Sequence, residues 1–314
     1  MKFLKALRKS DERPSNLEQP AEERPSTNGK FQNLVPTLFE DRDPKIGEAS
    51  IVESSVDSKN PFQPTQPTSP IVGGVQEDIV FPTFFVDEER VNRHLVSITD
   101  PKSAYCEEYR NLRTTLLQKS KKQRLKTIAV VSVAPSEGKS VTALNLAWLL
   151  AQTEGVTALA IDGDLRLPSL SQYVGYSSAV GLSEVLDGDV TLRDAVVRLE
   201  PSGLHLLPGG QTRDDVAELM SGPTFANILA EAQDLFDFVI IDAPPLSVFV
   251  DAKVLINQTD GAILVLRSNY TNFKDVERVL EGLPRERMLG VVLNQADETL
   301  IGGRNYDYPY YRRG

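Results

Sequence analysis

A short loop between an apolar run and a helix-like run constrains this chain more than any other feature. The apolar run covers residues 127–133, the loop ends in Gly138-Lys139-Ser140, and the helical pattern covers residues 141–152. A strand, a tight turn ending in Gly-Lys-Ser and a helix form a phosphate-binding loop, because backbone N–H groups and the positive end of the helix dipole surround the phosphate groups. The sequence therefore predicts an α/β fold that holds a polyphosphate at this loop.

Individual residues of the loop have distinct expected roles. Lys139 is expected to reach the β- and γ-phosphates, and the Ser140 hydroxyl to hold Mg²⁺. Val133 stands where the usual pattern has its first glycine, so the Gly-Lys-Ser end is expected to do most of the binding. A chance turn before a helix is the alternative, but the strand and helix context disfavours it. The residues expected to contact the nucleotide are Pro135, Ser136, Glu137, Gly138, Lys139, Ser140 and Val141.

The bulk composition narrows the class of protein. The 314 residues suffice for one large α/β domain with extra segments or for two small domains, and the net charge of −10 disfavours nucleic acid as the main partner. Cys106, the single cysteine, excludes a disulfide framework and a cysteine-based metal site, and suits the cytoplasm. We expect no signal peptide and no spanning helix, since no apolar run approaches the roughly 20 residues that a spanning helix needs.

The chain divides by composition into three parts. Residues 1–95 are rich in Pro, Ser, Glu, Asp and Gln and are predicted to be disordered, because such a segment buries too little apolar surface. Within them, residues 1–9 suggest either a short basic amphipathic helix or a solvated tail, and residues 79–86 form an apolar island that would dock on the folded domain. Residues 96–298 are the predicted folded domain, and residues 299–314 a flexible tail.

Strands and helices alternate through the predicted domain, which indicates a mostly parallel sheet with helices on both faces, of the P-loop NTPase type. The predicted strands are residues 127–133, 156–161, 204–207, 238–241, 262–267 and 289–293. The predicted helices are residues 103–118, 141–152, 181–186, 192–199, 214–220, 224–233, 251–256 and 272–283.

Aspartates follow two of the predicted strands. Asp162 and Asp164 follow the strand at residues 156–161, and Asp242 follows the strand at residues 238–241. Ligands of such sheets bind beyond the carboxyl ends of the strands, so these side chains should gather near the phosphate loop. Two carboxylates one residue apart repel each other unless a cation lies between them, and a magnesium nucleotide supplies that cation.

The same residues suggest phosphoryl transfer to a hydroxyl group. Asp242 is expected to hold Mg²⁺ through water, and either Asp162 or Asp164 to accept the proton of an attacking hydroxyl, while Arg166 would order the loop or stabilise transferred charge. The structural alternatives are a turn or cap aspartate at Asp242 and a self-satisfied ion pair near Arg166. The expected metal ligands are Ser140, Asp162 and Asp242. The expected catalytic residues are Lys139, Asp162, Asp164, Arg166 and Asp242.

Four further features lie outside this cluster. Glu107, Arg110 and Arg113 project together from the helix at residues 103–118, where a local ion pair is the simplest explanation. Asp251 opens a helix and is expected to be its N-cap. His205 lies on a strand and is expected to be structural. Residues 302–314 contain four of the nine tyrosines, namely Tyr306, Tyr308, Tyr310 and Tyr311, and the residues between these tyrosines are charged or proline.

Together these residues resemble the bacterial tyrosine autokinases of exopolysaccharide synthesis, the BY-kinases, over residues 96–314. The phosphate loop is similar to the family's Walker A motif, Asp-Gly-Asp-Leu-Arg at residues 162–166 to its Walker A′ motif, and residues 238–245 to its Walker B motif. Glu-x-x-Arg-x-x-Arg at residues 107–113 resembles the helix that joins subunits into rings. Asn294 falls in a segment similar to the one that contacts adenine.

The resemblance implies an ATP- and Mg²⁺-dependent, non-specific protein-tyrosine kinase that phosphorylates itself in trans. The tail tyrosines Tyr306, Tyr308, Tyr310 and Tyr311 of one subunit would receive the γ-phosphoryl group in a neighbour's site. The resemblance also implies a homo-oligomeric ring, a separate membrane-anchored polysaccharide copolymerase as activator, a phosphotyrosine phosphatase, and control of exopolysaccharide or capsule polymerisation and export. The protein would then be cytoplasmic and peripheral to the inner face of the cell membrane through its partner.

Two other functions remain open from the sequence. A partition or positioning ATPase of the same fold usually has a second lysine early in the loop, where this chain has Ala134, and needs no tyrosine tail. A non-catalytic nucleotide-binding adaptor of a membrane copolymerase would not need the complete acidic set of Asp162, Asp164 and Asp242. If the tail is not the phosphate acceptor, Tyr270 and Tyr109 are the next candidates.

Overall fold

The computed structural model describes residues 4–6, 80–248 and 251–296, and all of these except Val80 belong to one compact unit. The strands are β1 Leu4–Ala6, β2 Thr83–Phe85, β3 Thr127–Ser132, β4 Ala158–Asp162, β5 Val197–Glu200, β6 Leu204–Leu207, β7 Phe238–Asp242, β8 Gly261–Arg267 and β9 Met288–Asn294. The helices are α2 Val96–Thr99, α3 Ala104–Ser120, α4 Lys139–Ala151, α5 Leu170–Tyr173, α6 Leu182–Asp187, α7 Leu192–Ala195, α8 Val216–Ser221, α9 Pro223–Leu235, α10 Asp251–Gln258 and α11 Phe273–Glu281, with a 3₁₀ turn η1 at Arg285–Arg287.

The described strands form one sheet in the order β1-β9-β8-β3-β7-β4-β6-β5-β2. Neighbouring strands are parallel except β5 and β6, which are antiparallel. Every residue of β3, β4 and β7 is buried. These strands have continuous apolar sequences because parallel strands in the middle of a sheet are covered on both faces. The predicted α/β class with a mostly parallel sheet is confirmed.

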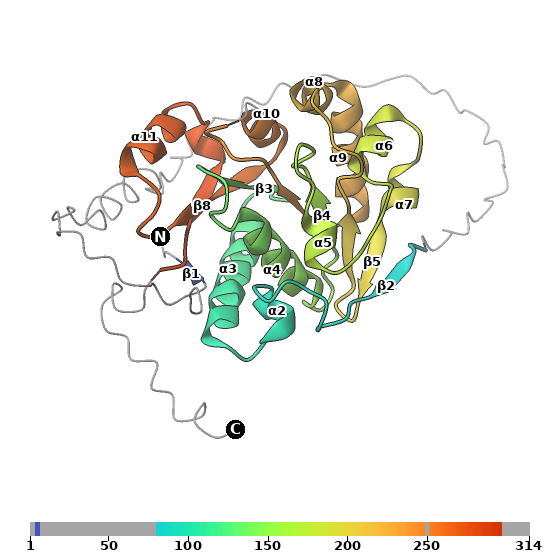
Figure 1. The fold of residues 1–314 in the computed structure, drawn as a ribbon, viewed down its shortest axis with the longest axis horizontal. Helices are drawn as coiled ribbons and strands as arrows, with labels where there is room; N and C mark the ends of the chain where they lie inside the picture. Colours follow the sequence, from blue (N-terminus) through green and yellow to red (C-terminus); the bar gives the residue numbers. More distant parts are fainter. Residues whose placement is uncertain (1–3, 7–79, 249–250, 297–314) are drawn as a thin grey trace, which may run out of the picture. The chain divides into compact units, whose positions relative to one another are not determined.

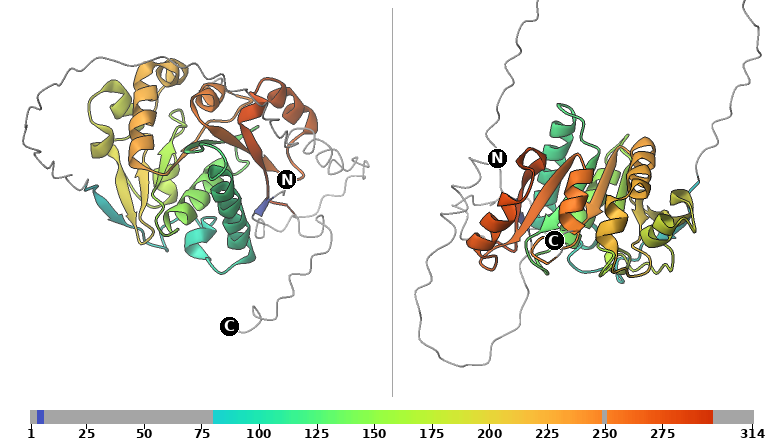
Figure 2. Two further views of the ribbon diagram at one scale, coloured as in Figure 1. Left: turned by 180° about the vertical axis from the view of Figure 1, so that it is seen from behind. Right: turned by 90° about the horizontal axis from the view of Figure 1, so that it is seen from above.

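Helices cover both faces of the sheet, as Figures 1 and 2 show. Ile128 and Val130 of β3 belong to the apolar cluster formed with α2, α3 and α4. Ala129 and Val131 of the same strand belong to the cluster formed with α6 to α11. Alternate residues of a strand point to opposite faces, so one buried strand contributes to both cores. The sheet thereby brings the carboxyl ends of β3, β4 and β7 to a single edge.

The prediction of a helix at residues 192–199 is wrong for its second half. Helix α7 ends at Ala195, and β5 begins at Val197. Val197 and Leu199 are buried while Arg198 between them is exposed, which is the alternation of a strand with one covered face. Pairing of β5 with both β6, which follows it closely in the chain, and β2, which lies more than 100 residues earlier, decides the structure here.

The folded chain begins earlier than the predicted boundary at residue 96. Residues 80–95 are part of it, and β2 pairs in parallel with β5. The ring of Phe81 lies 4.8 Å from that of His205 and 5.9 Å from that of Phe236, between ring centroids. The apolar island therefore docks on the domain as expected. His205 packs against aromatic rings, as expected for a structural residue on a strand, and burial lowers its pKa to about 4.

The described part of residues 1–9 is neither the helix nor the free tail that the sequence suggested. It is strand β1, which pairs in parallel with the last three residues of β9. The physical reason is the open edge of β9, whose backbone N–H and C=O groups bind an added strand. The rest of residues 1–79 and all of residues 297–314 lie outside the described residues. Within the described ranges, no helix has the length and apolar character to cross a membrane.

Candidate active site

The phosphate loop connects the central strand β3 to the first turn of α4, and its conformation depends on Gly138. The φ angle of Gly138 is 95°, in the left-handed region that side chains disfavour. A Cβ atom on Gly138 would lie 2.0 Å from Nδ2 of Asn294, so any other residue would displace the Asn294 amide. Helix α4 begins at Lys139 and exposes its free N–H groups toward the loop, as the sequence predicts for a phosphate site.

Glu137 supports the loop from inside, a role that sequence reasoning missed. Its side chain is fully buried, and its carboxylate accepts hydrogen bonds from the Ala134 backbone N–H at 2.9 Å and from the Thr271 hydroxyl. Burial raises the pKa of Glu137, and these hydrogen bonds oppose that shift. The Asn294 amide donates to the Glu137 carbonyl at 2.8 Å, so the end of β9 also holds the loop.

Lys139 lies among the carboxylates that the sequence places at the neighbouring strand ends. Its Nζ atom is 2.9 Å from Oδ2 of Asp164 and 3.3 Å from Oδ2 of Asp242. The Ser140 hydroxyl donates to the same Asp242 oxygen at 2.5 Å. Burial alone would lower the pKa of Lys139, but the two carboxylates outweigh burial and raise it. The lysine therefore keeps its positive charge at this edge of the sheet.

Asp162 completes the acidic cluster from β4, where it is the register partner of Asp242 on β7. Its Oδ2 atom accepts from the backbone N–H groups of Ser169 at 2.7 Å and Leu170 at 2.8 Å. Burial, together with the charge of Asp242, raises the pKa of Asp162 to about 7. Burial likewise raises the pKa of Asp242. Ionised carboxylates at this site therefore need more positive charge than Lys139 supplies.

The cluster fits a magnesium nucleotide. Oδ1 of Asp162 and Oδ1 of Asp164 are buried and accept no hydrogen bond in the described part of the chain, and carboxylate oxygens are ligands that Mg²⁺ prefers. No three His, Cys, Asp or Glu side chains of the described residues are arranged to bind a metal by themselves. This agrees with the usual Mg²⁺ site, in which one or two carboxylates act together with substrate phosphates and water.

Arg166 and Asp251 join the loop after β4 to the start of α10. The Arg166 Nε atom is 2.7 Å from Oδ2 of Asp251, which is fully buried. The expectation that Asp251 caps α10 is corrected, because Asp251 is the first helical residue and its carboxylate binds Arg166. The ion pair joins the loop that carries Asp164 to α10, and loop ordering stays one of the two predicted roles of Arg166.

The expected oligomer residues lie together on α3. Arg110 binds Glu107 at 2.5 Å and also donates to the Pro101 carbonyl at 2.7 Å. Arg113 donates to the Leu149 carbonyl at 3.4 Å. The glutamate and Arg110 thus form the local ion pair that the spacing allows, on a helix that packs against α4.

The candidate acceptor tyrosines differ in accessibility. Tyr306, Tyr308, Tyr310 and Tyr311 lie outside the described residues. Tyr109 is 2% exposed on the inner side of α3, so as a reserve acceptor it is ruled out, while Tyr270 is 63% exposed. Burial raises the pKa of Tyr109 to about 12, in keeping with a phenol that does not ionise.

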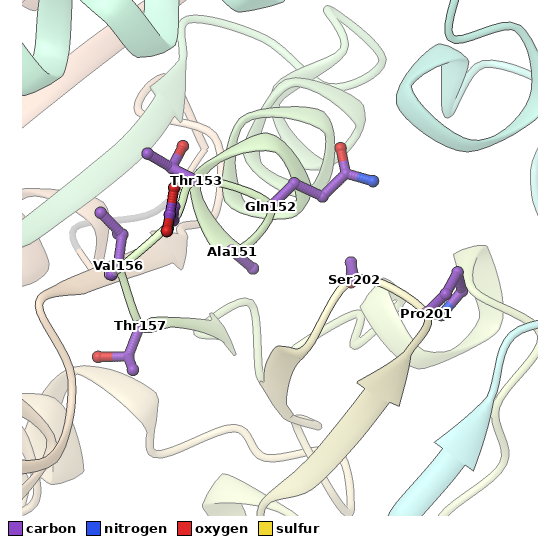
Figure 3. A pocket seen from close by; sticks show the side chains of 9 residues that line it. Ala151, Gln152, Thr153, Val156, Thr157, Pro201 and Ser202 are labelled. Carbon is purple, nitrogen blue, oxygen red and sulfur yellow. The ribbon is translucent and has the colours of Figure 1, made fainter.

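A separate pocket lies away from the phosphate loop, and Figure 3 shows the side chains that line it. It is lined by residues 151–157 together with Pro201 and Ser202. These residues precede β4 and β6, so the pocket is at the amino ends of those parallel strands, opposite the phosphate loop. Its one charged lining residue is Glu154, which leaves it without a cation for phosphate groups.

A phosphate loop follows the central parallel strand β3, and aspartates end the next two strands on one side of it, β7 and β4. This arrangement defines a P-loop nucleotide-binding protein. A family model described as an AAA domain matches residues 125–285. Tyrosine-protein kinase YwqD of Bacillus subtilis is 33% identical over 224 residues, which cover 71% of this chain and 92% of that protein. The chain belongs to this AAA-domain family and, within it, to the bacterial tyrosine-protein kinases.

Two further comparisons extend this assignment. The kinase domain of Escherichia coli tyrosine kinase ETK superposes with a TM-score of 0.61 at 26% identity, covering 68% of this chain and 84% of that domain. The succinoglycan biosynthesis transport protein ExoP of Rhizobium meliloti is 32% identical over 219 residues, or 68% of this chain. Those residues are only 28% of ExoP, so the chain matches one part of a much longer transport protein.

Proposed function

We propose that this protein transfers the γ-phosphoryl group of ATP to tyrosine hydroxyls, in the first place those of Tyr306, Tyr308, Tyr310 and Tyr311 on a neighbouring copy. The observation that carries the proposal is the convergence of Lys139, Ser140 and two aspartates on the phosphate loop. In the proposed reaction the tyrosine oxygen forms a bond to the γ-phosphorus, the bond from that phosphorus to the β-bridging oxygen breaks, and ADP leaves.

The chain's own residues have the following proposed roles. Backbone N–H groups of residues 136–141 and the Lys139 ammonium bind and orient the β- and γ-phosphates. Asp164 accepts the tyrosine proton, because it is the least buried of the three aspartates and one of its oxygens has no hydrogen-bond partner in the described part of the chain. Ser140, Asp162 and Asp242 hold Mg²⁺, which when bound neutralises the phosphate charge and aligns the reacting groups.

We also place this activity in the assembly of a secreted polysaccharide. Support comes from the similarity to ExoP, whose name describes succinoglycan biosynthesis and transport. The proposed activator is a membrane-anchored polysaccharide copolymerase on a separate chain, which would hold this protein at the inner face of the membrane. A homo-oligomeric ring through Glu107, Arg110 and Arg113 would present each tail to the next subunit, and a phosphotyrosine phosphatase would reverse the modification.

The proposal is tested by incubating the purified full chain with Mg²⁺ and γ-labelled ATP. We expect label on tyrosine in the wild type, at least about a hundredfold less in Lys139→Met, and loss of most label when the four tail tyrosines are replaced by Phe. Lys274→Met, which removes an exposed lysine, and Tyr270→Phe serve as matched controls that should keep the label. ATP hydrolysis with no phosphotyrosine in the wild type would instead support a positioning-type ATPase.

A further inference from the structure

Strand β1 occupies the outer edge of β9 at the end nearest the phosphate loop. Its register pairs Leu4 with Val292, Lys5 with Leu293 and Ala6 with Asn294. Because the two strands are parallel, both end at the carboxyl edge of the sheet, where the nucleotide loop lies. β1 lies next to α3 as well as β9, at the extreme strand position of the sheet (Figures 1 and 2).

The residue beside the end of β1 is one that holds the loop. The Asn294 side chain donates to the Glu137 carbonyl, and its Nδ2 atom lies 2.0 Å from the position that a Cβ atom of Gly138 would take. On the inner side of β9, the Asn294 carbonyl accepts from the Ser268 backbone N–H at 2.8 Å. On the outer side, the described chain offers only β1 to hold this strand end.

The sequence of this segment favours docking on the domain. Residues 1–10 contain Lys2, Lys5, Arg8 and Lys9 and no acidic residue, whereas the whole chain carries a net charge of −10. Electrostatic attraction therefore draws the segment to the domain, and backbone hydrogen bonds to the open edge of β9 fix its register. A pairing of three residues is short enough to form and dissociate without unfolding the sheet.

We propose that β1 is a positioning element of the nucleotide site: its pairing with β9 fixes Asn294 against the Glu137–Gly138 peptide and so raises the affinity of the loop for nucleotide phosphates. This inference rests on the proposed nucleotide-binding function of that loop. The occupant of the β9 edge is the N-terminal segment of the protein itself. Release of β1 frees the end of β9, loosens the loop and weakens ATP binding, while the sheet stays folded.

The test compares full-length variants in a fluorescence titration with N-methylanthraniloyl-ATP and Mg²⁺. Leu4→Pro/Ala6→Pro removes two backbone N–H groups and disfavours pairing, whereas Leu4→Val/Ala6→Val keeps both groups and serves as the matched control. We expect the proline variant to bind the nucleotide about three- to tenfold more weakly than the wild type, with the valine variant unchanged. The thermal midpoint without nucleotide should stay within a few degrees of the wild type.

A peptide of residues 1–12, added in excess to the proline variant, should restore binding. The same peptide with proline at positions 4 and 6 has the same charge and should not. Equal nucleotide affinity of the wild type and the proline variant overturns the inference. So does a loss that the native peptide fails to restore, or one that both peptides restore equally. A wild type that binds no nucleotide overturns the proposed function instead, so the two failures are distinguishable.

Discussion

At the scale of single residues, the site is a buried cation surrounded by more negative charge than it balances. Lys139 contacts Asp164 and Asp242 directly, and Asp162 adds a third carboxylate from the adjacent strand. The excess negative charge costs free energy while the site contains only protein groups. A magnesium nucleotide brings the missing positive charge together with phosphates for Lys139, so the same cluster that destabilises the fold favours binding.

The titration of Asp162 makes the free energy of unfolding depend on pH in a direction that can be measured. Its pKa is about 7 in the folded protein against an ordinary value of 3.8, so the folded state holds a proton that the unfolded state has lost between these pH values. The free energy of unfolding therefore falls as the pH rises from about 4 to 7. Asp162→Asn keeps an oxygen for the Ser169 and Leu170 N–H groups and removes the charge.

We expect Asp162→Asn to raise the free energy of unfolding by about 1–3 kcal/mol at pH 8 and by much less at pH 5. The measurement is urea denaturation at both pH values in EDTA without nucleotide. The variant should lose tyrosine phosphorylation, since a proposed Mg²⁺ ligand is gone. An equal gain at both pH values would show that charge is not the cause.

A substitution at Gly138 tests how much space the phosphate loop leaves for a side chain. Gly138→Ala places a side chain at a φ of 95° and against Nδ2 of Asn294, so we expect a loss of about 1–3 kcal/mol in the free energy of unfolding and weaker nucleotide binding. Adding Asn294→Ala removes the clash but not the unfavourable φ, and should recover only part of the stability. Denaturation of the two single variants and the double variant measures this; an unchanged Gly138→Ala protein would contradict it.

At the scale of elements, the acidic loop after β4 is held in place by contacts to distant elements. The Gly163 backbone N–H donates to the Asp242 carbonyl at 2.8 Å, and Arg166 binds Asp251 at the start of α10. Contacts to two elements distant in the chain, β7 and α10, thus fix the backbone on which Asp164 lies. The position of the proposed proton acceptor depends on these contacts as much as on its own side chain.

Replacing Asp251 by Asn distinguishes between its two possible roles, as an ion-pair partner of Arg166 and as a helix cap. Asn caps helices about as well as Asp, so a capping role predicts no effect of Asp251→Asn. The ion pair instead predicts a loss of about 1–3 kcal/mol in the free energy of unfolding, because the amide removes the charge that Arg166 meets at a buried position. Chemical denaturation of Asp251→Asn checks this, with Asp275→Asn on an exposed face of α11 as a control.

The sequence was informative where local patterns decide the structure. Continuous apolar runs predict the buried strands β3, β4, β7 and β8, and the Gly-Lys-Ser turn predicts the loop. It failed for β5, because the apolar spacing at residues 192–199 also fits a helix and only pairing with β6 and β2 decides between them. Strands β1 and β2 are three residues each and gain their structure from sheet edges that no local pattern reveals.

The candidate site shows the same division. The residue types and spacings identified Lys139, Ser140 and the three aspartates, because their chemistry is tied to short motifs. The hydrogen-bond partners of Glu137 and Arg166 could not be predicted from local sequence, because Thr271 and Asp251 lie 134 and 85 residues away along the chain. A glutamate inside a phosphate loop is ordinary in sequence, and only the tertiary structure shows that it is fully buried.

At the scale of the whole molecule, phosphorylation should change assembly. Each phosphotyrosine adds roughly −1.5 to −2 charges, and several on one tail would repel each other and the acidic site of a neighbour. We therefore expect a ring that holds together through α3 to come apart when the tail is phosphorylated.

Size-exclusion chromatography with light scattering measures this change in assembly. Wild-type protein incubated with Mg–ATP should have a lower mass than the same protein treated with a phosphatase. The variant with phenylalanine at Tyr306, Tyr308, Tyr310 and Tyr311 should stay assembled under both conditions. Equal mass of the wild type in both states would refute the link between tail charge and assembly.

We propose that Lys139, Ser140 and the three aspartates at one edge of the sheet form a site that phosphorylates tyrosine. Tandem mass spectrometry of the full chain after incubation with Mg–ATP would detect this reaction at individual tyrosines. We expect phosphate on tyrosines within residues 306–311 of the wild type and none on the Lys139→Met variant. A wild-type chain that consumes ATP and carries no phosphotyrosine would contradict it.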